Sequence, residues 1–302
     1  MNPHQVSKIL LSPELIDCIV FWTKNPEPMF ARLHELKNYA YYFQFTLTGY
    51  GGDMEPNVPH KKNHMISVFR RLADMVGSSR VVWRYDPILF NDIYTEAYHI
   101  QAFGQIAEAL SGYTHRCVIS FVDIYAKNKA AMKALGIRQD VSCGWNISDR
   151  QTEDDGYMTS DNGLNKLKIF AGKLDYIARQ YGMEITSCAE EMDLSDCGIG
   201  HSSCIDRVLV EEITGYAIEA GKDKNQRASC GCVESIEVGV YHTCLNGCRY
   251  CYANDSLERV QRNYKRYDVD SPLLCGRIGE GDKVTDRKMK SLKKGQIELT
   301  FI

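Results

Sequence analysis

The sequence predicts an α/β protein whose parallel strands form a (β/α) barrel or a partial barrel. Two observations lead to this fold class. Short β-rich apolar runs alternate along the chain with segments in which apolar residues recur at helical spacing. The chain has 302 residues, the size of one ordinary α/β barrel, and shows no evident linker, repeat or low-complexity run. A doubly wound open sheet is the alternative architecture.

Six apolar runs have the composition of strands. The predicted strands cover residues 18–23, 41–48, 81–86, 117–123, 183–187 and 235–241. Between them, apolar residues at intervals of three and four predict helices. The helical patterns cover residues 29–36, 65–76, 94–110, 127–135, 164–177 and 207–214, and the polar stretch 148–160 is typical of a surface loop. We therefore expect residues 1–302 to form a single barrel-like domain, with a cysteine-rich metal-binding part at 186–275.

The composition is that of a globular protein. Hydrophobic residues make up 44% and charged residues 25%, which excludes disordered, collagen-like and coiled-coil proteins. The net charge of −3 gives no indication of a nucleic-acid partner. Charged residues interrupt the most apolar early region, and the N-terminus lacks the pattern of a signal peptide. The sequence therefore predicts a cytoplasmic protein with no membrane partner.

Cysteine is the outlier in this composition. The chain has 12 cysteines, and nine of them follow residue 150. A disulfide-bonded secreted domain is normally shorter and carries a signal peptide. Clustered cysteines in a reducing compartment indicate metal or redox chemistry instead.

The strongest local signal is the sequence from Cys244 through Cys248 to Cys251, with the spacing C-x3-C-x2-C. Short intervals allow three thiolates to converge, and thiolates are the ligands of iron–sulfur clusters. Three cysteine ligands leave one iron of a four-iron cluster open to a small molecule. A closed cluster with four cysteines and a structural zinc ion are the alternatives, with Cys232 or Cys275 as the fourth ligand.

Four segments of the chain carry a family resemblance: residues 20–26, 83–88, 119–123 and the cysteine segment 244–254. The last of these, with Tyr250 just before the final cysteine, resembles the cluster-binding motif of the radical S-adenosylmethionine (radical SAM) superfamily. Over nearly its whole length the chain resembles an uncharacterised bacterial family, domain of unknown function 1848. The resemblance implies a radical SAM-like barrel with a permuted strand order, because the cluster motif comes late in the chain. Members of the family begin with a further strand and helix before the position of Met1, so closure of the barrel is in question at that edge.

The resemblance also implies a function. A 4Fe-4S cluster on the three cysteines would reductively cleave S-adenosylmethionine, with Tyr250 beside the adenine, and the product would abstract hydrogen from an unknown substrate. A low-potential protein such as flavodoxin or ferredoxin would donate the electron. The alternative function is a non-catalytic iron–sulfur electron carrier or a zinc-stabilised binding protein.

Polar residues follow the predicted strands, and their side chains meet at one edge of a parallel sheet. The candidates for lining the substrate and cofactor cavity are Lys24, Arg84, Asp86, Asp123 and Glu190. Thr48, Gly51 and Gly52 are candidates for cofactor binding, since a Gly-Gly-acid sequence holds the methionyl amine in radical enzymes, although a simple turn is favoured there. The alternative for the charged residues is that they only mark where strands emerge into solvent, or pair with each other.

A second set of cysteines is a candidate metal site. Cys230 and Cys232 are too close in sequence for a relaxed local disulfide, and with Cys188 and Cys204 they would supply four thiolates. Such a site would hold an auxiliary iron–sulfur cluster or zinc. The alternative is that Cys188 is an ordinary small apolar residue at the end of a strand.

Overall fold

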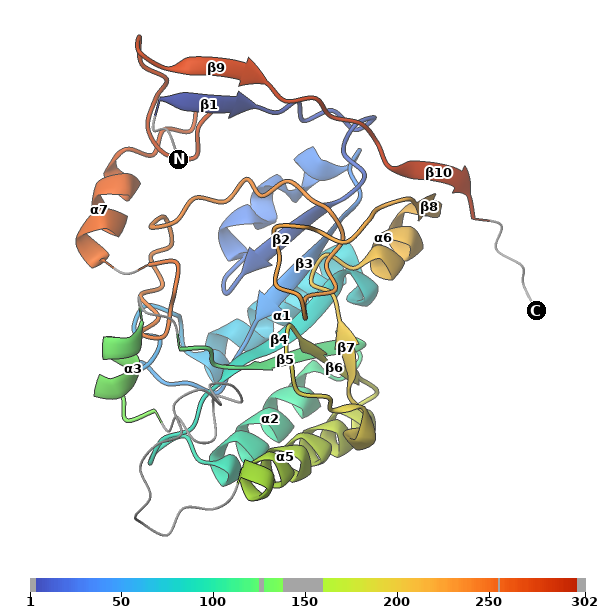
Figure 1. Ribbon diagram of the computed structural model, residues 1–302, viewed down its shortest axis with the longest axis vertical. Coiled ribbons are helices and arrows are strands. Elements are labelled where there is room, and N and C mark those ends of the chain that lie inside the picture. Colours follow the sequence, from blue (N-terminus) through green and yellow to red (C-terminus); the bar gives the residue numbers. More distant parts are fainter. Residues whose placement is uncertain (1–3, 125–127, 138–159, 255, 298–302) are drawn as a thin grey trace.

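The computed structural model describes residues 4–124, 128–137, 160–254 and 256–297 (Figure 1). Nearly all of the loop predicted at 148–160 lies outside these ranges. The central feature is a six-stranded sheet with the order β2-β3-β4-β5-β6-β7, in which every neighbouring pair is parallel. Its strands are β2 (Ile19–Thr23), β3 (Tyr41–Thr46), β4 (Val81–Ile88), β5 (Arg116–Phe121), β6 (Glu184–Cys188) and β7 (Gly200–Ser202).

The α/β class is confirmed, but the sheet is open, with β2 and β7 at its edges. Strand order follows chain order, so every crossover runs in the same direction and the connecting helices collect on one side. These helices are η1 (Glu27–Leu36), α1 (Ile66–Val76), α2 (Glu96–Leu110) and α5 (Ser160–Gln180), with η2 (Lys61–Met65) and η3 (Ser78–Arg80) flanking α1. A closed barrel, which one form of the prediction called for, is not formed.

The remaining helices of the described ranges are α3 (Lys129–Ala134), η5 (Ser195–Cys197), α6 (Arg207–Thr214) and α7 (Leu257–Lys265). Two further sheets have two strands each. In one, β1 (Gln5–Lys8) near the start of the chain pairs in parallel with β9 (Lys283–Asp286) near its end, and in the other β8 (Tyr216–Ile218) pairs antiparallel with β10 (Lys293–Gln296) (Figure 1). Asp17 fixes the same region, because its carboxylate accepts from the Ser291 hydroxyl at 2.5 Å and the Leu292 N–H at 2.8 Å.

Local signals explain several helix boundaries. Thr95 caps α2 by accepting from the Tyr98 N–H, and Asp206 caps α6 by accepting from the Val208 N–H at 2.8 Å. Gly215 ends α6 in the left-handed conformation, with φ of 72°. None of the helices in the described ranges has the length and apolar character needed to cross a bilayer.

Two sequence predictions about strands are wrong. Residues 235–241 form no strand, and Val238 and Val240 in that run are 56% and 46% exposed, so the alternation of apolar residues there reflects no buried face. The sixth strand is instead β7, whose sequence Gly-His-Ser has low β-propensity and gives no signal. The predicted end of β4 before Pro87 is also wrong, because the strand continues to Ile88. The register shifts between Tyr85 and Ile88, where Pro87 lacks an N–H for the ladder.

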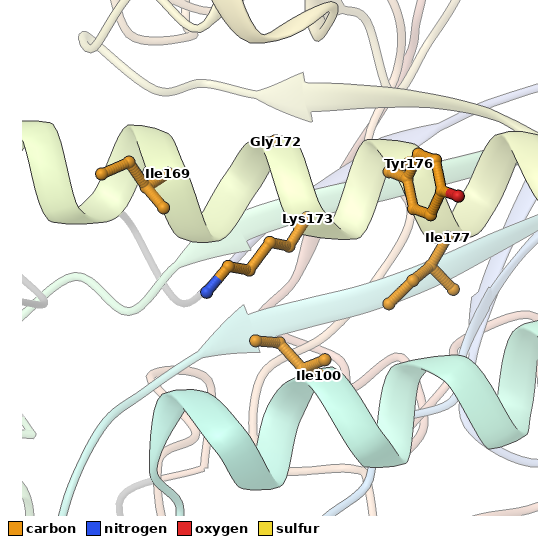
Figure 2. A pocket seen from close by; sticks show the side chains of 6 residues that line it. All are labelled: Ile100, Ile169, Gly172, Lys173, Tyr176 and Ile177. Carbon is orange, nitrogen blue, oxygen red and sulfur yellow. The ribbon is translucent and has the colours of Figure 1, made fainter.

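Helices α2 and α5 leave a shallow apolar groove of about 390 Å³ on the helical layer (Figure 2). Ile100 of α2 faces Lys173 and Ile177 of α5 across it. Lys173 is the one basic or acidic residue in its lining, and Tyr176 adds one hydroxyl. The groove therefore lacks the convergent polar groups that a catalytic site needs.

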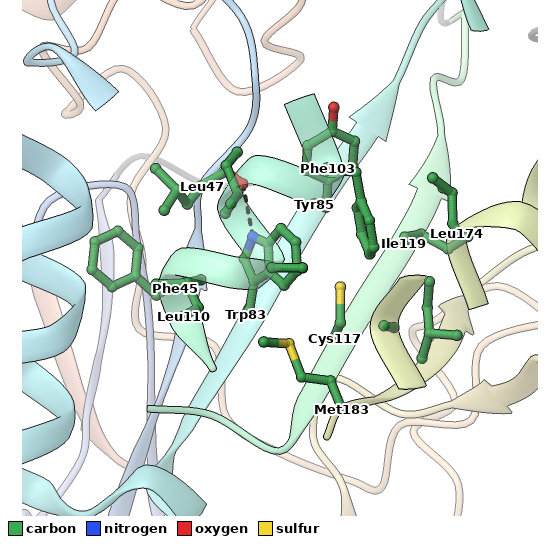
Figure 3. Close-up of a cluster of buried hydrophobic side chains, with 14 of the residues drawn as sticks. Phe45, Leu47, Trp83, Tyr85, Phe103, Leu110, Cys117, Ile119, Leu174 and Met183 are labelled. Carbon is green, nitrogen blue, oxygen red and sulfur yellow. Dashed lines mark hydrogen bonds between the residues drawn. The ribbon is translucent and has the colours of Figure 1, made fainter. Parts of the chain in front are cut away.

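The two faces of the sheet have different surroundings because side chains alternate along a strand. On one face Phe45, Trp83 and Ile119 pack against the helices and form the main core (Figure 3). On the other face Tyr42, Val82 and Val118 pack in a second cluster with residues of α6 and with four buried cysteines, Cys188, Cys204, Cys230 and Cys232. Gln44 and Arg84 lie on this second face, because they are next in sequence to Phe45 and Trp83, whose side chains point to the first face. The polar and cysteine side chains that are candidates for function thus lie on the opposite face of the sheet from the main core.

Trp83 anchors the main core. Its ring is fully buried and stacks on Phe103 with centroids 4.7 Å apart, and its indole N–H donates to the Leu47 carbonyl at 2.8 Å. The substitution Trp83→Phe removes this hydrogen bond and part of the buried ring, so we expect a loss of about 2 kcal/mol in the free energy of unfolding. Urea denaturation measures this loss. Trp22→Phe, at a half-exposed ring, is the matched control and should cost less than about 0.5 kcal/mol.

Candidate functional site

Two groups of cysteines lie at the carboxyl edge of the sheet. The first is the cysteine loop, residues 244–251, which carries Cys244, Cys248 and Cys251. The second is the thiol cluster, made of Cys188, Cys204, Cys230 and Cys232, all of them buried.

The cysteine loop is docked on residues 54–57, in the segment that follows β3. The Arg249 N–H donates to the Met54 carbonyl at 3.0 Å. Asn57 binds the loop through both its backbone and its side chain. Its backbone N–H donates to the Asn246 carbonyl at 3.2 Å, and its side-chain amide donates to the Leu245 carbonyl at 2.7 Å. Backbone groups of the loop therefore take a direct part in its docking.

A glycine is required at the centre of this docking. Gly247 has φ of +66°, a conformation that other residues rarely adopt. A Cβ at this position would lie 3.1 Å from the Asn57 amide nitrogen and 3.4 Å from the Pro56 ring. The glycine between the first two cysteines thus permits both the turn and the close approach of residues 56–57.

Tyr250 turns inward between Cys248 and Cys251. Its side chain is buried, and its hydroxyl donates to the Glu55 carboxylate. Its ring lies 5.7 Å from that of Tyr50, and the Lys24 ammonium lies 5.5 Å from the ring centroid. The aromatic position of the cysteine motif is therefore tied to the ends of β2 and β3.

Glu55 is the centre of this part of the site. Its carboxylate is wholly buried and accepts from four side chains: Lys24, Thr48, Lys61 and Tyr250. The distance is 2.8 Å to the Lys24 ammonium and 2.9 Å to the Thr48 hydroxyl. Sequence reasoning missed both Glu55 and Lys61, because each lies in a segment without regular periodicity before or at the start of η2.

The cysteine loop and Lys24 share one electrostatic environment. Burial lowers the pKa of Lys24, and the nearby Cys248 thiolate and Asp86 carboxylate oppose this shift. Burial raises the pKa of Cys248; Lys24 counteracts this effect, whereas Cys251 and Cys244 add to it. Joint ionisation of the three thiols is therefore unfavourable unless a bound cation compensates their charge.

The donor set of the cysteine loop consists of three cysteine sulfurs, the ligand type of iron–sulfur clusters. Within the described ranges, no three Cys, His, Asp or Glu side chains are arranged to hold one metal ion. A cluster binds each thiolate on a different iron, so its ligands do not need to meet at one point. Of the two candidate fourth ligands, Cys232 belongs to the thiol cluster, and the Cys275 thiol donates to the Asn263 carbonyl at 3.5 Å. The three cysteines of the loop are thus the donors available to such a cluster.

Arg84 and Asp86 form a buried ion pair between the two groups of cysteines. The Arg84 Nε lies 3.1 Å and 3.0 Å from the two carboxylate oxygens of Asp86. The Arg84 Nη1 donates to the Gln44 side-chain oxygen at 3.3 Å and to the Cys204 sulfur at 2.9 Å. On the other side, the field of Asp86 reaches Lys24. The mutual pairing that the sequence left open does occur, and the pair also connects the two sites electrostatically.

The thiol cluster is held together by sulfur–sulfur contacts. The Sγ atoms of Cys188 and Cys204 are 2.8 Å apart, and Cys232 hydrogen-bonds both Cys204 and Cys230. The hydrogen bonds with Cys204 lower the pKa of Cys188 and of Cys232, and the same bonds raise the pKa of Cys204. The four residues that sequence spacing grouped as a candidate metal site are therefore neighbours in the fold.

The remaining candidate residues occupy the same edge of the sheet. Asp123 pairs with Arg227 at 2.6 Å, and both side chains are about half exposed. Glu190 accepts from the Phe121 N–H at 2.7 Å, and burial raises the pKa of its carboxyl to about 7.

Gly51 and Gly52 lie in a turn, where the Gly51 carbonyl accepts from the N–H groups of Met54 and Glu55. Asp53 is exposed and accepts from the Tyr94 hydroxyl at 2.6 Å. The turn places Glu55 next to its partners and places residues 54–57 against the cysteine loop.

A family model matches most of the chain. The model of the family described as "Domain of unknown function (DUF1848)" matches residues 1–253. The match spans the six-stranded sheet, the thiol cluster and the cysteine loop. No protein with curated annotation matches the chain.

Neutralising Glu55 tests its role as the centre of the site. Glu55→Gln leaves two lysine ammoniums without their shared buried counter-charge, so we expect a loss of about 3 kcal/mol in the free energy of unfolding. Chemical denaturation at pH 7 measures it. Glu27→Gln is the control, because Glu27 pairs with His64 at a site where both side chains are about 40% exposed, and it should cost less than about 1 kcal/mol. Equal losses in the two variants would contradict the central role of Glu55.

The raised pKa of Glu190 predicts that the stability of the protein depends on pH. Its pKa is about 7 in the folded chain against an ordinary value of 4.5, so the folded state favours the neutral acid and the protein loses stability as pH rises through this window. Glu190→Gln removes the ionisation. We expect this variant to be more stable than the wild type by about 1–2 kcal/mol at pH 8, with the difference shrinking towards pH 5. Thermal unfolding across pH measures this, with Glu191→Gln at the exposed neighbouring position as the control.

Proposed function

The chain belongs to the family named domain of unknown function 1848, and we propose that it is an iron–sulfur enzyme that reductively cleaves S-adenosylmethionine and abstracts hydrogen from a substrate. The observation that carries this proposal is the docking of three cysteines on one loop beside Lys24, at the carboxyl edge of a parallel sheet. Ligands of α/β proteins bind at this edge. A reduced, cysteine-rich protein of this kind suits the cytoplasm.

In this proposal Cys244, Cys248 and Cys251 hold a 4Fe-4S cluster through their thiolates. When bound, such a cluster supplies the electron that splits S-adenosylmethionine into methionine and a 5′-deoxyadenosyl radical, which takes hydrogen from the substrate. The electron comes from a low-potential protein such as flavodoxin or ferredoxin.

The residues around the cysteine loop have the charge that this role requires. Glu55 faces two ammonium groups with one carboxylate, so a positive excess remains beside the loop while Lys24 and Lys61 are protonated. This excess stabilises thiolates and attracts the carboxylate of an amino-acid ligand. Burial lowers the pKa of Lys61 to about 7, so the excess is largest below neutral pH.

The second face of the sheet is the proposed substrate side. Arg84 and Asp86 carry fixed charges between the two groups of cysteines. Asp123 and Glu190 follow β5 and β6 at the same edge. These four side chains are placed to orient a polar substrate. Arg84 and Asp86 hold each other, Arg227 holds Asp123, and the Phe121 N–H holds Glu190, so each is preorganised. In this proposal the open parallel sheet does the work of a partial radical SAM-like barrel.

The alternative function is a non-catalytic electron carrier or a zinc-stabilised binding protein. It requires a fourth protein ligand at the cysteine loop and no affinity for S-adenosylmethionine. The contact of Cys275 with Asn263 gives that cysteine another partner.

The test is anaerobic reconstitution of the full chain with iron and sulfide, followed by dithionite and S-adenosylmethionine. We expect 5′-deoxyadenosine from the wild type and at least a 100-fold loss in Cys248→Ala, because a ligand of the cluster is missing. Cys275→Ala is the matched control and should retain the activity.

Two results would contradict the proposal. One is cluster-loaded wild-type protein that forms no 5′-deoxyadenosine. The other is a loss of the cluster in Cys275→Ala as complete as that in Cys248→Ala, which would make Cys275 the fourth ligand and favour the electron carrier.

A further inference from the structure

The thiol cluster gathers cysteines from three separate parts of the chain. Cys188 ends β6, Cys204 follows β7, and Cys230 and Cys232 lie in the segment that leads towards the cysteine loop. Their exposed fractions are only 5–7%. Isolated buried cysteines are ordinary packing residues, but four with direct contacts between their sulfurs form a concentrated set of soft ligands.

Polar donors surround these sulfurs. The Arg84 guanidinium donates to the Cys204 Sγ at 2.9 Å, and the Ile205 N–H donates to the Cys232 Sγ at 3.3 Å. A buried guanidinium and a backbone N–H directed at sulfur stabilise a thiolate more than a neutral thiol. Hydrogen bonds of this kind to ligating sulfurs are typical of metal–thiolate centres.

The backbone at Cys204 is also held in place. Its carbonyl accepts from the Tyr42 hydroxyl at 2.6 Å and from the Gln44 side-chain amide at 3.0 Å. Both donors are buried side chains of β3, at the middle of the second face of the sheet. The sheet thus positions the residue at the centre of the chain of sulfur contacts, as supporting residues do around metal ligands.

We propose that Cys188, Cys204, Cys230 and Cys232 bind one zinc-type divalent ion as a closed, structural four-thiolate site, separate from the cysteine loop. The bound ion replaces the protons of the thiols that ligate it, and these protons pass to solvent. No oxidant or reductant is required. The ion ties β6, β7 and the segment at 230–232 together, next to the ion pair of Arg84 and Asp86.

The compactness of the sulfurs favours a single ion over a cluster. With Zn–S bonds of about 2.3 Å, tetrahedral ligands stand about 3.8 Å apart. The contact of 2.8 Å between Cys188 and Cys204 is shorter than this, so those sulfurs must separate by about 1 Å when the ion binds. This agrees with the finding that no described group is already arranged to hold an ion. An iron–sulfur cubane needs its thiolates still farther apart and would require a larger movement.

The experiment measures metal content in a variant that lacks the cysteine loop ligands. The full chain carrying Cys244→Ala, Cys248→Ala and Cys251→Ala is expressed with added zinc and analysed by elemental mass spectrometry. We expect one zinc per chain. Adding Cys204→Ser should lower this at least tenfold, whereas adding Cys197→Ser, whose thiol donates to the Lys168 carbonyl outside the cluster, should leave it unchanged.

Cobalt provides a second measurement on the same protein. Co²⁺ in place of zinc should give the intense visible and sulfur-to-metal absorption of a tetrahedral thiolate site, and Cys232→His, which keeps a ligand, should shift these bands without abolishing them. The cobalt spectra therefore test the four-thiolate site even if the Cys204→Ser variant does not fold.

Three outcomes would overturn the inference. They are a loop variant without metal, retention of zinc after Cys204→Ser, and iron with acid-labile sulfide in place of zinc. Since the loop variant lacks the ligands of the proposed catalytic cluster, these outcomes are independent of whether S-adenosylmethionine is cleaved.

Discussion

The buried carboxylate of Glu55 is the interaction on which the candidate site depends. It binds Lys24 at the end of β2, Thr48 after β3 and Tyr250 in the cysteine loop, so one side chain joins segments about 200 residues apart in sequence. Removing a carboxylate from water is costly, and two ammoniums and two hydroxyls are needed to compensate. The same network that stabilises the carboxylate therefore dictates where the cysteines of the loop can lie.

A second consequence of the topology is that chemistry and packing occupy opposite faces of the sheet. Strand alternation places Trp83 in the helical core and Arg84 towards the cysteines. The ion pair of Arg84 and Asp86 reaches sulfur on one side and Lys24 on the other. The ion pair is therefore in electrostatic contact with both groups of cysteines, with the thiol cluster through Arg84 and with the cysteine loop through Lys24.

Much of the fold was predictable because buried strands are apolar runs. Strands β2 to β6 lie where such runs occur, and α6 has the predicted bounds. The sixth strand was not predictable, since β7 has three residues without β-propensity, whereas the run at 235–241 has the pattern of a strand but no buried face to occupy. At the site, spacing alone grouped the cysteines, but Glu55 and Lys61 become visible only through tertiary contacts, because neither belongs to a periodic element or a motif.

The pairing of β1 with β9 has a practical implication for defining this domain. The family match ends at residue 253, yet β9 and the segment at 291–292 come after it and supply the partners of β1 and Asp17. A polypeptide trimmed to the matched residues would leave β1 with a bare edge and Asp17 without its two donors. Contacts of β1 and Asp17 therefore lie beyond the span by which relatives are recognised, and a domain border drawn at residue 253 would remove them.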